Sequence, residues 1–161
     1  MTILIERLDV STYIIPTDFP ESDGTLAWDK TRLVLVEPTA GGVRGLGYTY
    51  ADTATARLIK DLLAGVVQGR DAMAVTGAWA AMVHAIRNLG RPGIVSMAIS
   101  AVDAALWDLK ARLLNVPLVT LLGVVRECVP VYGSGGFTSY STHNFKSNLR
   151  AGPPRGLRAS K

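Results

Sequence analysis

The chain has 161 residues, of which 48% are hydrophobic, which is enough to bury one sizeable core and suggests a single domain. Its formal net charge of +4 arises in the C-terminal part, because residues 1–128 carry 12 basic and 13 acidic side chains and no acidic residue follows Glu127. A basic tail without a recognisable reading module is typical of a solvated segment, so nucleic acid is not an expected partner.

Cysteine content and hydropathy predict a cytoplasmic protein. Cys128 is the single cysteine, so no internal disulfide can form, and we expect it to be an inert structural residue. Glu6 and Arg7 interrupt the apolar run that a secretory signal needs. The longest uncharged stretch near the middle, residues 72–86, is too short to span a bilayer, so a membrane is not an expected partner either.

The N-terminal third predicts strands. Residues 3–15 are rich in strand formers, and we expect Pro16 to end this strand. Residues 16–30 lack periodicity and contain two prolines and a glycine, which predicts a surface loop. Residues 31–37 and 45–50 form the next two strands, and the glycines between them predict a hairpin.

Helices are predicted after residue 50. Asp52 caps a helix to about Val67, and a second helix spans residues 75–89 and ends at Gly90. A third begins at Ser96 and stops at Asn115, and Trp79 and Trp107 on these helices suit the core. The third helix has one apolar stripe, formed by Ile99, Val102, Leu106, Leu109 and Leu113. Residues 117–122 predict a short helix closed by Gly123, and residues 142–149 another. Strands followed by helices favour an α+β layer, with helices on one face of an antiparallel sheet.

The third helix also carries a longer pattern. Residues 98–112 read Ala-x-Ser-Ala-Val-Asp-x-Ala-Leu-x-Asp-Leu-x-Ala-Arg, and Pro117-Leu118 and Leu121-Leu122-Gly123 follow. This pattern resembles the mandelate racemase and muconate lactonizing group of the enolase superfamily. Residues 129–136, Val-Pro-Val-Tyr-Gly-Ser-Gly-Gly, resemble the first strand of that family's catalytic barrel.

The resemblance covers residues 1–141 and implies an α+β fold in which a three-stranded antiparallel sheet is followed by a helical bundle, with a stub of a (β/α) barrel. It implies an enolase-like N-terminal capping domain over residues 1–128, and a first barrel strand with an irregular or incomplete barrel segment over residues 129–161. A (β/α)₈ barrel takes ~250 residues, so we expect the chain to hold only part of the family's enzyme. A natural fragment, a truncated gene and an altered reading frame after about Ser141 all stay open.

The resemblance also implies a chemistry. Enzymes of this family abstract the proton alpha to a carboxylate and stabilise the resulting enediolate on Mg²⁺. The family's metal carboxylates project from the third, fourth and fifth barrel strands, which this chain lacks, and no acidic residue follows Val129 to build an oxygen cage. We therefore assign no metal ligand and expect no cofactor for this chain, although Mg²⁺ serves the parent family.

Two N-terminal loops cover the barrel mouth in the family and shape the substrate pocket. They correspond here to residues 16–30 and to the segment around residues 48–51. The resemblance thus implies four candidate substrate-binding residues, Phe19, Trp28, Tyr48 and Tyr50. The alternative for each of them is ordinary surface or hairpin packing.

The barrel-like segment adds two candidates. Ser134 resembles a substrate-contacting position of mandelate racemase, and the alternative is that residues 133–136 form a flexible turn. Residues 156–161 resemble the approach to the second barrel strand, where the family has a Lys-x-Lys pair. Lys161 then stands where the first, catalytic lysine stands.

Our leading hypothesis is the substrate-capping N-terminal part of a Mg²⁺-dependent mandelate racemase-like enzyme, of the sugar-acid dehydratase or racemase class, inactive alone. Its partner would be a carboxylate-bearing small molecule. One alternative is a non-catalytic interaction module that pairs with itself or with a full-length relative through the strand edge at residues 129–132 and apolar helix faces. Another is a nucleic-acid binder that uses the basic tail. The substrate, the choice between racemase, dehydratase and cycloisomerase, and the oligomeric state stay open.

Overall fold

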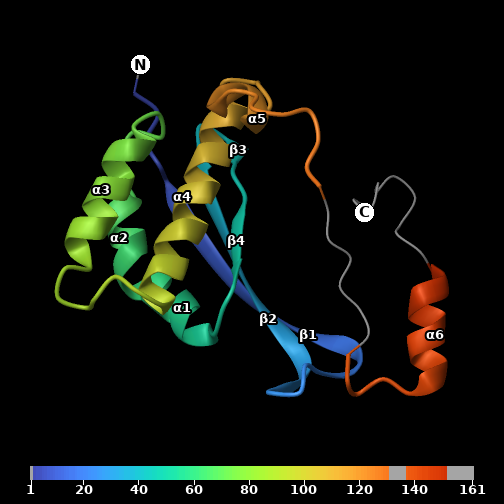
Figure 1. Ribbon diagram of the computed structural model, residues 1–161. Coiled ribbons are helices and arrows are strands. Elements are labelled where there is room, and N and C mark those ends of the chain that lie inside the picture. Colours follow the sequence, from blue (N-terminus) through green and yellow to red (C-terminus); the bar gives the residue numbers. More distant parts are fainter. Residues whose placement is uncertain (1, 131–136, 152–161) are drawn as a thin grey trace. The chain divides into compact units, whose positions relative to one another are not determined.

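The computed structural model describes residues 2–130 and 137–151 of the chain (Figure 1). Four strands come first: β1 (Arg7–Ser22), β2 (Ala27–Ala40), β3 (Val43–Arg44) and β4 (Gly47–Tyr50). The helical elements are α1 (Thr53–Leu58), the π-helical η1 (Ile59–Leu63), α2 (Ala64–Val67), α3 (Val75–Ala85), α4 (Ile94–Leu113), α5 (Leu118–Leu122) and α6 (Thr142–Ala151). This order confirms the predicted α+β class. Among the described helices, none is long and apolar enough to cross a membrane.

The chain divides into two compact units. The first comprises Met1–Ile15 and Arg32–Gly123, and the second comprises Pro16–Thr31 and the chain from Val124 onward. The first unit holds the inner parts of β1 and β2 together with β3, β4 and α1 to α5. The second holds the outer parts of β1 and β2, which we call the distal hairpin, and α6. The domain boundary predicted after residue 128 stays a prediction.

The sheet is organised around β2, which lies between β1 and β3 in the strand order and also pairs with β4. β2 and β4 are antiparallel, with Leu33 opposite Tyr50 and Val36 opposite Gly47. Between β2 and β3 the chain reverses at Gly41 and Gly42, whose φ angles of 55° and 74° favour glycine. The predicted hairpin is therefore confirmed, and the structure adds the short strand β3 to the three strands expected.

The surface loop predicted over residues 16–30 is wrong. β1 continues through Pro16 and Pro20 to Ser22, and β2 already begins at Ala27. Proline is tolerated in a strand at the edge of a sheet, where its missing N–H removes no ladder hydrogen bond, and β1 is such an edge strand. The prolines and polar residues therefore mark an exposed strand edge rather than a loop.

The core of the first unit lies between α4 and the sheet. Val34 and Val36 of β2 are fully buried, and so are Val102 and Leu109 of α4. Ile99 and Leu106 are buried as well, whereas Leu113 is half-buried at the end of the helix, which confirms the predicted stripe. In Figure 1, α3 runs beside α4 in this layer.

Helix ends mostly follow the prediction. The Asp52 side chain accepts a hydrogen bond from the Ala54 N–H and caps α1, which continues through η1 and α2 to Val67. Asn115 has a φ of 52° just after α4, and Gly123 closes α5 with a φ of 86°. α3 ends at Ala85, earlier than the residue 89 expected.

The two tryptophans predicted to lie in the core, Trp79 and Trp107, differ in their burial. The core position predicted for Trp79 is wrong, because its side chain is 37% exposed and the Arg91 guanidinium lies 5.2 Å from its ring centroid. Trp107 is half-buried and packs against the core.

The barrel-like segment is described in part. Val129 and Pro130 have no regular secondary structure, and residues 131–136 lie outside the described residues. The strand edge predicted over residues 129–132 is therefore not described as a strand. The helix predicted over residues 142–149 is confirmed as α6.

Candidate functional site

At Gly47, the face of β4 that points toward α4 has room only for glycine. A Cβ atom on Gly47 would overlap the carbonyl oxygen of Ala101 and would lie 2.6 Å from the backbone nitrogen of Ala105. The strand and the helix therefore touch through their backbones. Because successive strand residues alternate between the two faces of a sheet, this contact places Tyr48 and Tyr50 on the face away from α4.

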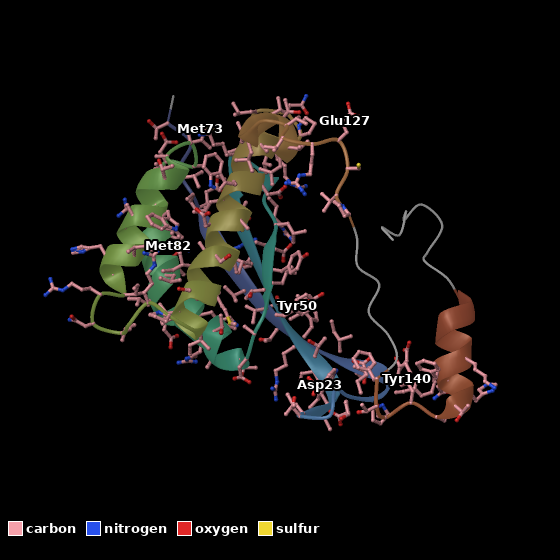
Figure 2. All side chains as sticks on the ribbon, viewed as in Figure 1. Asp23, Tyr50, Met73, Met82, Glu127 and Tyr140 are labelled. Atoms are coloured by element: carbon pink, nitrogen blue, oxygen red, sulfur yellow. The ribbon has the colours of Figure 1, made fainter. Side chains whose placement is uncertain are left out.

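The outer surface of β2 and β4, which we call the tyrosine face, consists of Leu33, Leu35, Tyr48 and Tyr50. Tyr48 and Tyr50 are 57% and 63% exposed, and their rings meet edge to face with centroids 6.0 Å apart. The two leucines are half-buried and lie directly opposite the tyrosines across the strand pair. Figure 2 shows Tyr50 projecting from β4 on the side away from α4. A rigid strand thus presents two amphipathic rings to solvent.

Asp108 of α4 fixes the approach to β4. Its Oδ2 accepts a hydrogen bond of 2.8 Å from the Leu46 N–H and pairs at 2.7 Å with Nε of Arg112, one helical turn further on. The Leu46 amide directly precedes the strand that carries the tyrosines. The second Asp of the signature pattern therefore has a visible structural task, which is to hold the start of β4 against α4.

Asp52 fixes the chain after Tyr50. Hydrogen bonds from the Ala54 N–H and from the Thr53 hydroxyl, in that order, lower the pKa of Asp52 below its usual value. Its Oδ2 also lies 3.1 Å from Nη1 of Arg32 on β2. The predicted loop around residues 48–51 is thus the end of a strand joined to a capped helix, which gives the tyrosine face a firm backbone.

The distal hairpin carries the other two pocket candidates. Phe19 on the β1 arm is 52% exposed. Trp28 on the β2 arm is half-buried, and its indole Nε1 donates a 2.6 Å hydrogen bond to Oε2 of Glu21 on the opposite arm. The Trp28 ring also meets Phe137 edge to face at 5.5 Å. Trp28 therefore packs within the hairpin unit, whereas Phe19 presents its side chain to solvent.

Asp23 organises the hairpin turn. Its Oδ1 accepts hydrogen bonds from the Thr25 hydroxyl, the Thr25 N–H and the Leu26 N–H at 2.6, 2.8 and 3.0 Å. The Thr25 hydroxyl is the largest cause, followed by the two amides, and together they lower the pKa of Asp23 to about 2. An ionised Asp23 side chain thus replaces the ladder hydrogen bonds that end at the turn.

The structure brings some of the predicted site residues together. Tyr48 and Tyr50 are neighbours on the first unit, whereas Phe19 and Trp28 belong to the second unit. The positions of Ser134 and Lys161 lie outside the described residues. Their predicted roles, and the pocket roles of the four aromatic residues, stay predictions.

The described acidic, histidine and cysteine side chains do not form a metal-binding cluster. Among residues 2–130 and 137–151, no three His, Cys, Asp or Glu side chains gather closely enough to hold a metal ion. The Asp23 and Glu21 carboxylates of the distal hairpin instead make hydrogen bonds within the turn and to Trp28. We assign no metal ligand to the described residues.

The sequence interpretation missed three residues of this site. Asp108, Glu21 and Phe137 each hold a candidate residue or its strand in place through the contacts above. Only Asp108 had a local signal, because Arg112 lies at the i+4 position where an ion pair forms on a helix. The partners Trp28 and Phe137 are too distant in the chain for any local pattern to connect them.

Comparison with known sequences gives one consistent result. The family model described as mandelate racemase / muconate lactonizing enzyme, N-terminal domain, matches residues 11–123. The 3,6-anhydro-alpha-L-galactonate cycloisomerase of Streptomyces coelicolor is 36% identical over 138 residues, which cover 82% of this chain and 38% of the relative. The L-talarate/galactarate dehydratase of Salmonella typhimurium is 30% identical over 144 residues, covering 83% of this chain and 36% of the enzyme. The chain thus spans under two fifths of the length of these curated relatives.

Solved structures agree. A mandelate racemase/muconate lactonizing enzyme-like protein from Rubrobacter xylanophilus superposes with a TM-score of 0.87 at 55% identity, over 92% of this chain and 41% of that one. The L-talarate/galactarate dehydratase of Salmonella typhimurium, liganded with Mg and L-lyxarohydroxamate, superposes with a TM-score of 0.81 at 28% identity. That match covers 94% of this chain and 41% of the enzyme.

Proposed function

We propose a function from one premise, which is that this chain belongs to the mandelate racemase / muconate lactonizing enzyme family. The chain supplies the substrate-capping part of a Mg²⁺-dependent enzyme that acts on sugar acids. The reaction would be proton abstraction alpha to a carboxylate, of the dehydratase or racemase class. The observation that carries this proposal is the match of the family's N-terminal domain to residues 11–123. Named relatives support the substrate class, since they are a sugar-acid dehydratase and a cycloisomerase.

The proposed task of the chain's own residues is to shape a substrate pocket and to exclude water from it. Mg²⁺, when bound by such an enzyme, neutralises charge that grows on the substrate carboxylate. The described residues do not suit a metal site, so we assign them no metal-dependent step. Instead, the exposed Tyr48 and Tyr50 rings are our candidate substrate contacts on the first unit, and the exposed Phe19 ring is a separate candidate on the distal hairpin. Large side chains with few rotatable bonds exclude water at small entropic cost. Lys161 remains our proposal for the first lysine of the catalytic pair.

We propose that the 161-residue chain alone does not turn over sugar acids. The test is an assay of the purified chain with Mg²⁺ against a panel that includes galactarate, L-rhamnonate and mandelate. We expect no product above the protein-free rate, because the match is to the N-terminal domain of the family. Clear turnover that scales with protein concentration would contradict this expectation.

The capping role itself can be measured in a chimera. This chain would replace the aligned segment of the Salmonella L-talarate/galactarate dehydratase, to which it is 30% identical. We expect the Phe19→Ala, Tyr48→Ala and Tyr50→Ala variants each to raise KM for galactarate about tenfold, or ~1.4 kcal/mol of binding. Leu89→Ala, an exposed position after α3, is the matched control and should leave KM unchanged. Equal KM values in all four variants would refute pocket lining.

Self-association is the second candidate, and exposed apolar side chains favour it. Tyr13 and Ile15 of β1 are 49% and 42% exposed, in addition to Tyr48 and Tyr50 of the tyrosine face. A second copy of the chain could cover these side chains. Sedimentation equilibrium tests this role, since Tyr48→Glu should dissociate such a dimer. A wild-type chain that stays monomeric at all concentrations would rule it out.

We also propose a reducing, cytoplasmic location. The single Cys128 is free and exposed, which suits a compartment in which thiols stay reduced. Cell fractionation with an antibody against the chain tests the location directly.

A further inference from the structure

A short segment far along the chain is bonded to the distal hairpin. The Thr138 N–H and the Thr138 hydroxyl both donate to the carbonyl oxygen of Ser22, at 2.9 and 2.8 Å. The Ser139 hydroxyl donates to the carbonyl oxygen of Pro20 at 2.6 Å. These bonds join segments that are far apart in the sequence, and they reach two alternate carbonyls of the β1 arm. Figure 2 shows Tyr140 beside the hairpin, within the same unit.

Aromatic rings close the same contact from the β2 arm. Trp28 meets Phe137 edge to face at 5.5 Å with an interplanar angle of 89°, and Phe137 meets Tyr140 in the same manner at 5.4 Å. We call these three rings the clasp. The Trp28 N–H is bonded to the Glu21 carboxylate on the β1 arm, so this single residue links both arms and the later segment. Edge-to-face pairs of this kind are favourable beyond the area that they bury.

The hairpin has few other means of support. Most side chains of Pro16–Thr31 are exposed, and an isolated two-stranded hairpin is at best marginally stable in water. Residues 137–140 add hydroxyl and amide hydrogen bonds and the ring contacts of the clasp to this region. The geometry of the distal hairpin therefore depends on residues 137–140.

Hydrogen bonds hold the backbone around Phe19, whose side chain is exposed and could contact a ligand. The Thr17 hydroxyl donates to the carbonyl oxygen of Phe19 at 2.7 Å, and the next carbonyl, that of Pro20, accepts from Ser139. The backbone on both sides of the Phe19–Pro20 peptide bond is thus held, while the Phe19 side chain stays 52% exposed. This arrangement fixes the position of a side chain without covering it.

We infer that the clasp of Trp28, Phe137 and Tyr140 positions the distal hairpin, and with it Phe19, over the substrate. Trp28 is then a positioning residue rather than part of the pocket wall. Phe137 directly follows residues 129–136, whose sequence resembles a first barrel strand, and active sites of such barrels form at the ends of the strands. The existence of the clasp does not depend on the proposed function, whereas its role in catalysis rests on it.

The clasp is tested first in the 161-residue chain by hydrogen exchange and by the Trp28 indole N–H resonance. We expect Phe137→Ala to speed exchange of the hairpin amides by about tenfold or more while α4 amides keep their rates, as for a local opening. Phe137→Tyr keeps the ring and should restore slow exchange. Glu21→Gln should shift the indole resonance, because it removes the charge that the N–H faces. Phe145→Ala removes an exposed ring of α6 and is the matched control.

A second variant keeps the test informative if Phe137→Ala misfolds. Thr138→Val with Ser139→Ala removes both hydroxyl donors and leaves every ring of the clasp, and it should speed exchange in the hairpin alone. Unchanged hairpin exchange in both the Phe137→Ala and the double variant overturns the clasp. Equal acceleration in Phe145→Ala overturns it as well.

The catalytic role is tested in the chimera with the Salmonella dehydratase. We expect Phe137→Ala to raise KM for galactarate by as much as Phe19→Ala does, with little change in kcat, because both misplace the same contact. Phe19→Ala should leave hairpin exchange unchanged. If Phe19→Ala raises KM and Phe137→Ala does not, the positioning role is overturned and the proposed function stands. If neither variant changes KM although Phe137→Ala speeds exchange, the pocket role of Phe19 fails and the clasp remains.

Discussion

The same two strands are stabilised in two different ways along their length. In the first unit, β2 places Val34 and Val36 in a fully buried layer, and its neighbour β4 lies directly against α4. In the distal hairpin, the continuation of β1 and β2 is largely exposed. It is held by hydrogen bonds to the carbonyl oxygens of Ser22 and Pro20 and by the Phe137 ring that meets Trp28. Buried apolar area stabilises the first region, and a few directed contacts stabilise the second.

The buried layer of the first unit stabilises the fold, whereas the distal hairpin is the region that can vary without unfolding the sheet. A close-packed layer is sensitive to changes in volume, so substitutions there affect the whole unit. A hairpin held by a few contacts can change its tip without unfolding the sheet beneath it, as surface elements that carry function often do. We therefore expect global effects from changes at α4 and local effects from changes at residues 16–31.

Among the substitutions that test this comparison, we expect Gly47→Ala to have the largest effect on stability. A methyl group at this position would overlap the carbonyl oxygen of Ala101, which is backbone and cannot turn aside. We expect a loss of about 3 kcal/mol or more in the free energy of unfolding, because β4 must move away from α4. Urea denaturation followed by circular dichroism measures this loss.

Gly65→Ala is the matched control for that change. Gly65 lies in α2 and is exposed, and no described atom beyond its chain neighbours and the backbone of its own helix lies within 4 Å of the point where the alanine methyl group would stand. We expect alanine there to stabilise the chain by about 0.5–1 kcal/mol, because glycine is a poor helix former. Equal losses from both substitutions would show that β4 and α4 do not touch through their backbones.

Local periodicity explains why the helical part could be predicted. The stripe from Ile99 to Leu109 repeats at helical spacing, and the same residues are the ones buried against the sheet. Asn115 and Gly123 mark ends because few other residues tolerate a positive φ, which depends on the local backbone alone. The order of strands followed by helices favours the α+β layer, and the resemblance of residues 98–112 to a known family implies the same fold. Sequence and fold agree here because each signal lies within a few residues of its effect.

The distal hairpin could not be predicted by the same means. Pro16 and Pro20 read as breakers, although they lie in an edge strand that needs no hydrogen bond from them. The contact of Trp28 with Phe137 and that of Ser22 with Thr138 join segments that no local pattern relates. The surface position of Trp79 could not be predicted either, because helical spacing does not show whether a face meets the core or, as here, an arginine at the surface.

Two carboxylates on α4 give a second, smaller test within the first unit. Asp108 holds Leu46 and Arg112, whereas the half-buried Asp103 makes no hydrogen bond or ion pair with the described residues. Asp108→Asn should lower the free energy of unfolding by about 1 kcal/mol, because a charge-assisted contact is lost. Asp103→Asn should raise it at neutral pH.

The pH dependence distinguishes the reason for the Asp103 effect. Burial raises the pKa of Asp103 above its usual 3.8, so its carboxylate form is disfavoured in the folded chain. Its destabilising contribution is present above the folded pKa and disappears as the pH falls through that value, because the folded state then takes up the proton more readily. Asp103→Asn should therefore stabilise at neutral pH and have little effect well below the usual pKa of 3.8. A gain that is the same at both pH values would contradict burial of the charge as the cause.

The smallest expected effect is confined to the hairpin turn. The Thr25 hydroxyl, with the amides of Thr25 and Leu26, holds the pKa of Asp23 at about 2. A lowered carboxyl pKa means that the turn contacts are complete above the usual pKa of 3.8 and are lost as the pH falls through about 2. Carbon-detected NMR titration of Asp23 should show this value, and Thr25→Val should move it toward 3.8, while Thr25→Ser, which keeps the hydroxyl, should not. Because the Asp23 carboxylate bonds within its turn, Phe137→Ala should leave its pKa unchanged, which separates the turn from the clasp as two independent supports of the hairpin. An Asp23 that titrates with the clasp would mean instead that the tip is one cooperative element.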